Sequence, residues 1–221
     1  MIPEKLVELS EYLNTQKFEV EDSQRDGRIN SILHEDKLTE LLAKKYPIDV
    51  PEARAWYDFA ITDDSIFYPV NIKSTEIKGD CNLQCKLGTY YALTGKIPEF
   101  SNECSWMDYF SNLKNDLPAK TAKIDEDYYF MVLDKTETRR TRFAKTRIYA
   151  LKGLYNITDN GANGFQCNFL KNDEVSQPKL VERSYEEVQK FLLGHLAQCA
   201  RLSSFQYVGF TTNFPGILKN V

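Results

Sequence analysis

The sequence predicts one domain of the mixed α/β (α+β) class, and three features support this expectation. Short runs rich in β-branched and aromatic residues alternate with longer segments of helical periodicity. The 221 residues contain no internal repeat, linker or low-complexity tract that would divide them. Hydrophobic residues make up 42% of the chain and aromatic residues 13%, which is enough to form a core. We therefore expect a single α/β domain over residues 1–221.

Helices are predicted where apolar residues recur at helical spacing beside start or stop signals. The C-terminal helix is the most strongly periodic, with Ser184 as its N-cap and Glu186 and Glu187 in its first turn. Another helix ends before Pro47, and Gly27 marks a break in the polar stretch that precedes it. The predicted helices span residues 3–14, 32–46, 106–113 and 184–202, while residues 83–94 form either a strand or a helix.

Strands are predicted by short runs of β-branched and aromatic residues. Two of these runs are separated by the four polar residues 62–65, which is typical of a hairpin. Two others are separated by residues 158–164, which are rich in turn formers. The predicted strands span residues 55–61, 66–74, 127–134, 146–156 and 165–170.

Composition excludes several classes of protein. The N-terminal segment is charged every few residues, so we expect no signal peptide. The chain has no run of 18 consecutive apolar residues, so we expect no membrane span. We therefore expect a cytoplasmic protein. The five cysteines lack CxxC spacing, which predicts reduced, mostly buried thiols rather than a disulfide scaffold or a zinc site. Only two histidines are present, His34 and His195, and no nucleophile motif accompanies them, which disfavours a histidine-based hydrolase.

Charge is unevenly distributed along the chain. The formal net charge is -4 and the sequence pI is about 5.4, which taken alone disfavours nucleic-acid binding. Yet residues 135–152 contain seven cations and one acid, Glu137. A concentrated basic segment in an acidic protein suits a nuclease, whose carboxylates bind metal while its cations bind phosphate. The alternative is a solvated run of charges.

The most informative stretch for chemistry is residues 55–75. Alternate side chains of a strand face opposite ways, so Asp58 on the first strand can share one side of the hairpin with Asn71 and Lys73 on the second. Val70 and Ile72 then point to the apolar side. Mg²⁺ prefers oxygen ligands, and a lysine can orient a water or stabilise negative charge, so this set suits metal-assisted phosphodiester hydrolysis. The alternative is an ordinary polar face of a surface hairpin.

This stretch resembles the PD-(D/E)XK nucleases, whose core hairpin carries an acid on one strand and an acid-x-Lys element on the next. Asp58 stands in the position of the first acid, and Asn71-Ile72-Lys73 stands in that of the acid-x-Lys element. The resemblance implies a restriction-endonuclease-like fold, in which helices flank a mixed central sheet. It also implies that Asp58, Asn71 and Lys73 are catalytic and that the cofactor is Mg²⁺.

Asn71 departs from the family pattern, because it replaces the second acid. Asn offers one neutral carbonyl oxygen, so the site is expected to bind metal more weakly unless another carboxylate compensates. The resemblance implies that natural variants carry Asn at this place, and an engineered Asp→Asn substitution is the alternative.

Glu35 is the candidate for the compensating carboxylate. Leu38 and Leu42 lie at i+3 and i+7 from Glu35, so this glutamate projects along the apolar face of its helix. The resemblance implies that a glutamate on the helix before the hairpin joins the metal site. The alternative is that Glu35, near the helix start, only complements the helix dipole.

Two further segments extend the resemblance to the EcoRV-like restriction enzymes. Residues 86–95, KLGTYYALTG, are similar to the stretch after their catalytic lysine, and residues 160–169, NGANGFQCNF, to their Gly/Asn-rich recognition loop. The resemblance covers residues 29–95, the expected catalytic core, and residues 155–170. It implies a type II restriction endonuclease that cleaves both strands of double-stranded DNA at a short palindromic site.

DNA contacts are predicted within about residues 135–170. The cations of the basic segment suit phosphates, and the amide side chains at the 158–164 turn suit base edges, although Asn is also a common turn former. The candidate phosphate contacts are Arg139, Arg140, Arg142, Lys145 and Arg147, and the candidate base contacts are Asn160, Asn163, Gln166 and Asn168.

The expected assembly is a homodimer. One chain carries one candidate site, cutting both strands needs two, and a two-fold dimer matches a palindrome. The apolar stripe of the 184–202 helix serves either the dimer interface or the core. Three other functions stay open: a DNA repair nickase or junction resolvase of the same fold, a catalytically impaired DNA-binding relative, and an unrelated α/β enzyme.

Overall fold

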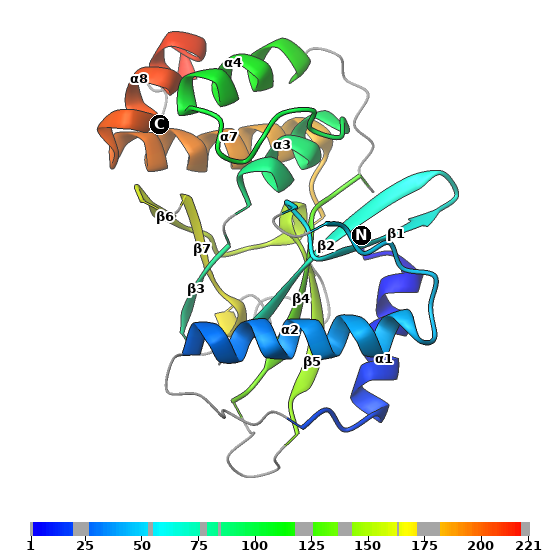
Figure 1. Ribbon diagram of the computed structural model, residues 1–221. Helices are drawn as coiled ribbons and strands as arrows, with labels where there is room; N and C mark the ends of the chain where they lie inside the picture. The colour runs from blue at the N-terminus through cyan, green and yellow to red at the C-terminus, as the bar shows by residue number, and fades with distance from the viewer. Residues whose placement is uncertain are drawn as a thin grey trace.

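The computed structural model describes residues 2–19, 27–52, 55–75, 79–83, 85–117, 126–136, 143–162, 164–171 and 182–217, with side chains from residue 32 onward in the second helix. It confirms the predicted mixed α/β class, with helices flanking sheets (Figure 1). None of the described helices is long and apolar enough to cross a membrane. All five cysteines are free of disulfides, and three of them, Cys85, Cys167 and Cys199, are buried.

The main sheet has four strands in the order β1 (Phe59–Asp63), β2 (Ile66–Thr75), β4 (Tyr129–Asp134) and β5 (Lys145–Ala150). Strands β2 and β4 run parallel, while β1 pairs with β2 and β5 pairs with β4 in antiparallel fashion. The sheet is therefore mixed. Strand β4 is buried along its whole length, as its apolar run YFMVL over residues 129–133 predicts.

The β1–β2 hairpin is tighter than the sequence predicts. Its turn consists of Asp64 and Ser65, both with positive φ (47° and 65°), a two-residue geometry that matches the twist of the flanking strands. The first strand begins at Phe59 rather than at residue 55, so its predicted start is wrong. Asp58 lies just outside the strand, although its backbone N–H still donates to the carbonyl of Val70 at 2.9 Å.

A second sheet contains three short antiparallel strands in the order β3 (Asp80–Asn82), β7 (Gly164–Asn168) and β6 (Thr158–Asn160). The predicted turn 158–164 is therefore partly strand, and its tip closes the β6–β7 hairpin. Gly161 is required there, because a Cβ would overlap the backbone of Leu202. Gly164 has φ +76°, which favours glycine.

All four predicted helices are present, with shifted ends. The helix predicted at 184–202 has a complete capping box between Ser184 and Glu187. Within the ambiguous segment 83–94, residues 86–94 are helical, and a C-terminal helix that was not predicted from the sequence follows residue 203. The helices are α1 (Glu4–Thr15), α2 (Gly27–Ala43), α3 (Lys86–Thr94), α4 (Trp106–Asp116), α7 (Tyr185–Arg201) and α8 (Ser204–Asn213), and the 3₁₀ turn η2 (Leu151–Gly153) replaces the predicted end of β5.

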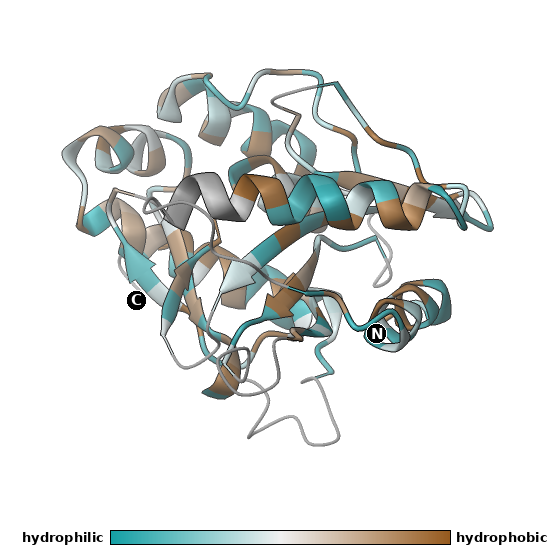
Figure 2. Ribbon diagram, turned by 60° about the horizontal axis from the view of Figure 1, so that its bottom comes forward, coloured by the Kyte–Doolittle hydropathy of each residue, from teal (hydrophilic) through white to brown (hydrophobic). Residues whose placement is uncertain are grey.

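The helices divide between the two faces of the main sheet. Helices α1 and α2 pack on one face, where Leu38 and Leu42 of α2 join the core of β1, β2 and β4. Figure 2 shows α2 crossing the molecule with hydrophobic and hydrophilic residues mixed along it. The other face carries α3, α4, α7, α8 and the second sheet. The apolar stripe of α7, with Val188 and Leu192 fully buried, belongs to this core and not to a free surface.

Gly88 in α3 provides a stability prediction. A Cβ at this position would overlap the ring of Tyr128, which is buried, stacks on Trp56 and donates its hydroxyl to the Trp56 carbonyl at 2.6 Å. Because the ring cannot move freely, Gly88→Ala is expected to lower the free energy of unfolding by about 1–3 kcal/mol despite the better helix propensity of Ala. Chemical denaturation monitored by circular dichroism measures the change.

Gly194 in α7 is the matched control, because a Cβ there meets no atom within 4 Å of the described structure. Gly194→Ala is expected to raise the free energy of unfolding by roughly 0.5–1 kcal/mol. Equal effects of the two substitutions would contradict the packing of α3 against Tyr128.

Candidate active site

The four residues predicted to be catalytic line one cavity of about 650 Å³. Asp58 precedes β1, Asn71 and Lys73 lie on β2, and Glu35 reaches the cavity from α2. The remaining wall comes from the other side of the molecule: Lys86 of α3, Asn102, Trp106 of α4, and Ala162 and Gly164 of the β6–β7 hairpin. The cavity therefore lies between the main sheet and the elements that pack on its second face.

Asp58 and Asn71 are in direct contact. The hairpin register pairs Phe59 with Val70, which sets Asp58 beside Asn71. One carboxylate oxygen of Asp58, Oδ2, accepts hydrogen bonds from Nδ2 of Asn71 at 2.9 Å and from the backbone N–H of Ile72 at 2.5 Å. The predicted convergence of these two side chains is confirmed, and no described residue donates to the second carboxylate oxygen of Asp58.

The carbonyl oxygen of the Asn71 side chain, Oδ1, is buried and accepts no hydrogen bond from the described residues. Exchanging the amide oxygen and nitrogen would set two oxygens against each other at Asp58, so the assigned orientation is the favourable one. A buried oxygen without a donor costs free energy unless a water or a cation occupies the space before it.

Burial raises the pKa of both carboxyl groups, and the charge of Asp58 also acts on Glu35. Burial raises the pKa of Asp58 above its usual range, against the opposing effects of the Ile72 N–H and the charge of Lys73. Burial, and to a smaller extent the negative charge of Asp58, raise the pKa of Glu35 to about 7 against the opposing effect of Lys73. The two acids are therefore close enough to repel each other, and a cation between them would favour their ionised forms.

The donor set fits magnesium. Glu35 and Asp58 supply carboxylate oxygens, and Asn71 supplies the buried oxygen that lacks a donor, which are the oxygen ligands that Mg²⁺ prefers. Within the described part of the chain, no group of three or more His, Cys, Asp or Glu side chains is arranged to hold a metal. Glu35, Asp58 and Asn71 contain only two acids, so they do not form a group of three such side chains.

Helix α2 positions Glu35. Leu38 and Leu42 are fully buried against the sheet, and Nδ1 of the buried His34 lies 3.1 Å from the hydroxyl of Ser74 on β2. The helix begins at Gly27, so Glu35 lies more than two turns inside it. The alternative role of Glu35 as a partner of the helix dipole is therefore wrong, because that interaction is confined to the first turn. This contact of His34 has no signal in the local sequence.

The predicted phosphate contacts are only partly covered by the structure. Arg139, Arg140 and Arg142 lie outside the described residues, and so does Asn163 among the predicted base contacts. Lys145 is exposed at the start of β5. Arg147 forms an ion pair with the buried Asp134, with Nε 3.4 Å from Oδ2. Arg147 therefore helps to join β5 to β4, and its contact with phosphate stays a prediction.

The amide side chains of the second sheet form contacts within the protein. The Oδ1 atom of Asn160 accepts from the N–H of Ala162 at 2.9 Å, and that of Asn168 accepts from the N–H of Lys171 at 3.1 Å. Gln166 donates from Nε2 to Oδ1 of Asn82, its partner across β7 and β3, at 2.6 Å. Asn160 and Asn168 thus act as turn formers here, and their role in reading bases stays a prediction.

Lys86, Asn102 and Trp106 are lining residues of the cavity that the sequence analysis did not identify. The resemblance includes the segment that begins at Lys86, but no pattern in the local sequence predicts that this lysine lies near Asp58 or Lys73.

A scan against protein-family models finds no match for this chain, and a search of curated proteins finds no significant relative. The fold and the geometry of the cavity are therefore the observations that bear on function.

Proposed function

We propose that this protein is a magnesium-dependent endonuclease with a site of the PD-(D/E)XK type. The observation that carries this proposal is that Glu35, Asp58, Asn71 and Lys73 line a single cavity that the β6–β7 hairpin also borders. Carboxylate and amide oxygens beside a lysine suit metal-assisted phosphodiester hydrolysis.

Each residue has a defined task in this proposal. Glu35, Asp58 and Asn71 hold the metal, and Asp58 is itself oriented by the N–H groups of Asn71 and Ile72. When bound, magnesium would polarise the scissile phosphate and lower the pKa of a bound water. Lys73 orients the attacking water and stabilises the negative charge that develops on the phosphate.

The particular enzyme we propose is a type II restriction endonuclease that cleaves a short palindromic site in double-stranded DNA as a homodimer. The position of the predicted recognition hairpin at the edge of the cavity supports this form. The described part of one chain offers one cavity lined by these four residues, so cutting two strands together requires a second copy. Sedimentation equilibrium is expected to give twice the chain mass.

Digestion of a sequenced supercoiled plasmid, followed by mapping of the ends, tests the proposal and its alternatives. Linear product with unique ends supports the type II enzyme. Accumulation of nicked circles alone supports a repair nickase, and cleavage restricted to branched substrates supports a junction resolvase. An absence of Mg²⁺-dependent cleavage on all of these substrates would overturn the nuclease proposal.

A catalytically impaired DNA-binding relative is the second candidate, and the amide at position 71 favours it. If Asn71 is a damaged ligand, Asn71→Asp restores a charge to the metal site and is expected to raise the Mg²⁺-dependent cleavage rate greatly. If Asn is native to the site, a third carboxylate beside Asp58 increases repulsion and the same substitution is expected to lower the rate. Single-turnover cleavage of plasmid at saturating enzyme distinguishes the two cases.

The affinity for Mg²⁺ is expected to depend on pH because of Glu35. Its pKa of about 7 in the metal-free protein means that it is mostly protonated at pH 6 and mostly ionised at pH 8. Since only the ionised form binds metal, Mg²⁺ affinity is expected to rise by about tenfold over this range, with release of a proton below pH 7. Calorimetric titrations in buffers of different ionisation enthalpy measure both quantities. Glu35→Gln is expected to remove this dependence, whereas Glu40→Gln, an exposed change on the same helix, retains it.

A further inference from the structure

Lys86, the first residue of α3, is a cation whose surroundings contain no described acid partner. Its amino group donates to the carbonyl of Cys104 at 2.6 Å and to that of Asn102 at 3.3 Å. The same nitrogen lies 4.6 Å from the centre of the Trp106 ring and 5.4 Å from that of Tyr109. Carbonyl dipoles and aromatic faces thus hold the lysine in one place without neutralising its charge.

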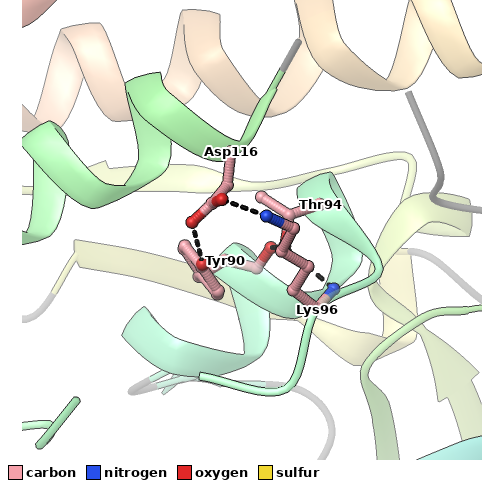
Figure 3. Close-up of polar contacts among 4 residues, drawn as sticks. All are labelled: Tyr90, Thr94, Lys96 and Asp116. Carbon is pink, nitrogen blue, oxygen red and sulfur yellow. Dashed lines mark hydrogen bonds and ion pairs between the residues drawn. The ribbon is translucent and has the colours of Figure 1, made fainter. Parts of the chain in front are cut away.

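Lys96 shows how a neighbouring lysine is neutralised. It forms an ion pair with Asp116, which also accepts a hydrogen bond of 2.5 Å from the hydroxyl of Tyr90 (Figure 3). This cluster lines a different cavity, which shares no described residue with the cavity of Asp58 and Lys73. Lys86 and Lys96 are therefore two lysines on one segment, one paired with a carboxylate and the other held by neutral groups.

We propose that Lys86 binds a phosphate of the DNA substrate next to the one that is cleaved. This inference rests on the proposed function and adds a substrate-binding residue to it. Lys86 lines the cavity from the helical wall, whereas Lys73 does so from the sheet, so a strand that enters would meet a cation on each side. The cavity also contains Glu35 and Asp58, whose negative charges would repel the phosphate backbone, and a fixed cation offsets that repulsion.

A purely structural role for Lys86 makes different predictions. In that case the lysine only fastens residues 102–104 and Trp106 to α3, and removing it lowers stability without changing the electrostatics of DNA binding. Phosphate contacts have a signature that such a role lacks, because each neutralised phosphate releases condensed counterions and makes binding more sensitive to salt.

The test compares Lys86→Met with Lys96→Met in binding a random-sequence duplex, with Ca²⁺ in place of Mg²⁺. Lys86→Met is expected to reduce the slope of log affinity against log salt concentration by about 0.9. The ratio of wild-type to variant affinity for DNA therefore falls about three- to fourfold between roughly 50 and 200 mM salt. Lys96→Met and Lys86→Arg are expected to keep the wild-type slope. A folded Lys86→Met protein with the wild-type slope overturns the proposal.

If Lys86→Met fails to fold, the wild-type protein provides the readout. Acylation of lysines with an N-hydroxysuccinimide ester, followed by mass spectrometry, is expected to be slower at Lys86 and unchanged at Lys96 when the duplex is bound. Equal rates at Lys86 with and without the duplex overturn the proposal. If the wild-type protein neither binds nor cleaves DNA, both the proposed function and this inference are wrong. If it cleaves DNA but neither the salt slope nor the acylation rate depends on Lys86, only this inference is wrong.

Discussion

Asp58→Asn is expected to reduce Mg²⁺-dependent DNA cleavage by roughly 10²–10⁴-fold or more, which is the range for removing an electrostatic group from a catalytic site. The substitution keeps the shape of the side chain and an oxygen that can accept from the Ile72 N–H. What it removes is one of the two negative charges available to the metal. Folding and DNA binding in Ca²⁺ are therefore expected to change little, and cleavage of plasmid under single-turnover conditions measures the loss.

Asp64→Asn is the matched control for this variant. Asp64 lies in the turn of the same hairpin, is exposed, and has a positive φ that Asn tolerates. Its substitution is expected to leave the cleavage rate unchanged. If Asp58→Asn retained more than a few percent of the wild-type rate, Asp58 would not be a metal ligand.

Lys73→Met is expected to lower the cleavage rate by about 10²–10⁴-fold while leaving Mg²⁺ binding in place. Met has a similar length and can occupy the same position on β2, but it neither orients a water nor stabilises negative charge. Lys73 also lowers the pKa of both Glu35 and Asp58, so the pKa of Glu35 in the metal-free variant is expected to rise above about 7. Cleavage kinetics and a pH titration of Mg²⁺ affinity measure the two effects.

Lys114→Met is the control for this second variant, because Lys114 is an exposed lysine on α4 that does not line the cavity. Its substitution is expected to affect neither quantity. A Lys73→Met protein that cleaves DNA as fast as the Lys114→Met protein would exclude Lys73 from the chemistry.

The contact between Asp58 and Asn71 could be predicted from sequence because the period of a strand is two. Two neighbouring runs with a short polar turn allow few registers, and the apolar positions Val70 and Ile72 select the one that buries them. Glu35 was predictable in the same way from the helical spacing of Leu38 and Leu42. These are local patterns, and the structure bears out the side on which each residue lies.

The helical wall of the cavity was not predictable from local patterns. Lys86, Asn102 and Trp106 reach the cavity only because α3 and α4 pack on the far face of the sheet. Asn82 meets Gln166 through pairing of strands more than 80 residues apart in sequence. Such contacts depend on tertiary packing and leave no periodic signal, and for the same reason the burial of Lys152 inside the basic segment was not expected.

The predicted boundaries of some helices and strands are wrong for a more local reason. The expected break at Gly27 is instead the first residue of α2, because glycine is tolerated at a helix start. The first strand of the hairpin starts late because residues 56–58 bend before β1 begins. That bend sets Asp58 at the edge of the sheet, facing the cavity, so the error in the strand boundary falls at the candidate site itself.

The dependence of plasmid cleavage on Mg²⁺ concentration, measured for the wild-type protein, tests most directly the claim that this cavity is a metal-dependent phosphodiesterase site. The rate of conversion of supercoiled DNA is expected to rise with Mg²⁺ to a plateau, to vanish in EDTA, and to be suppressed when Ca²⁺ replaces Mg²⁺. Cleavage that persists in EDTA, or a plasmid that stays intact at every Mg²⁺ concentration, would contradict the claim.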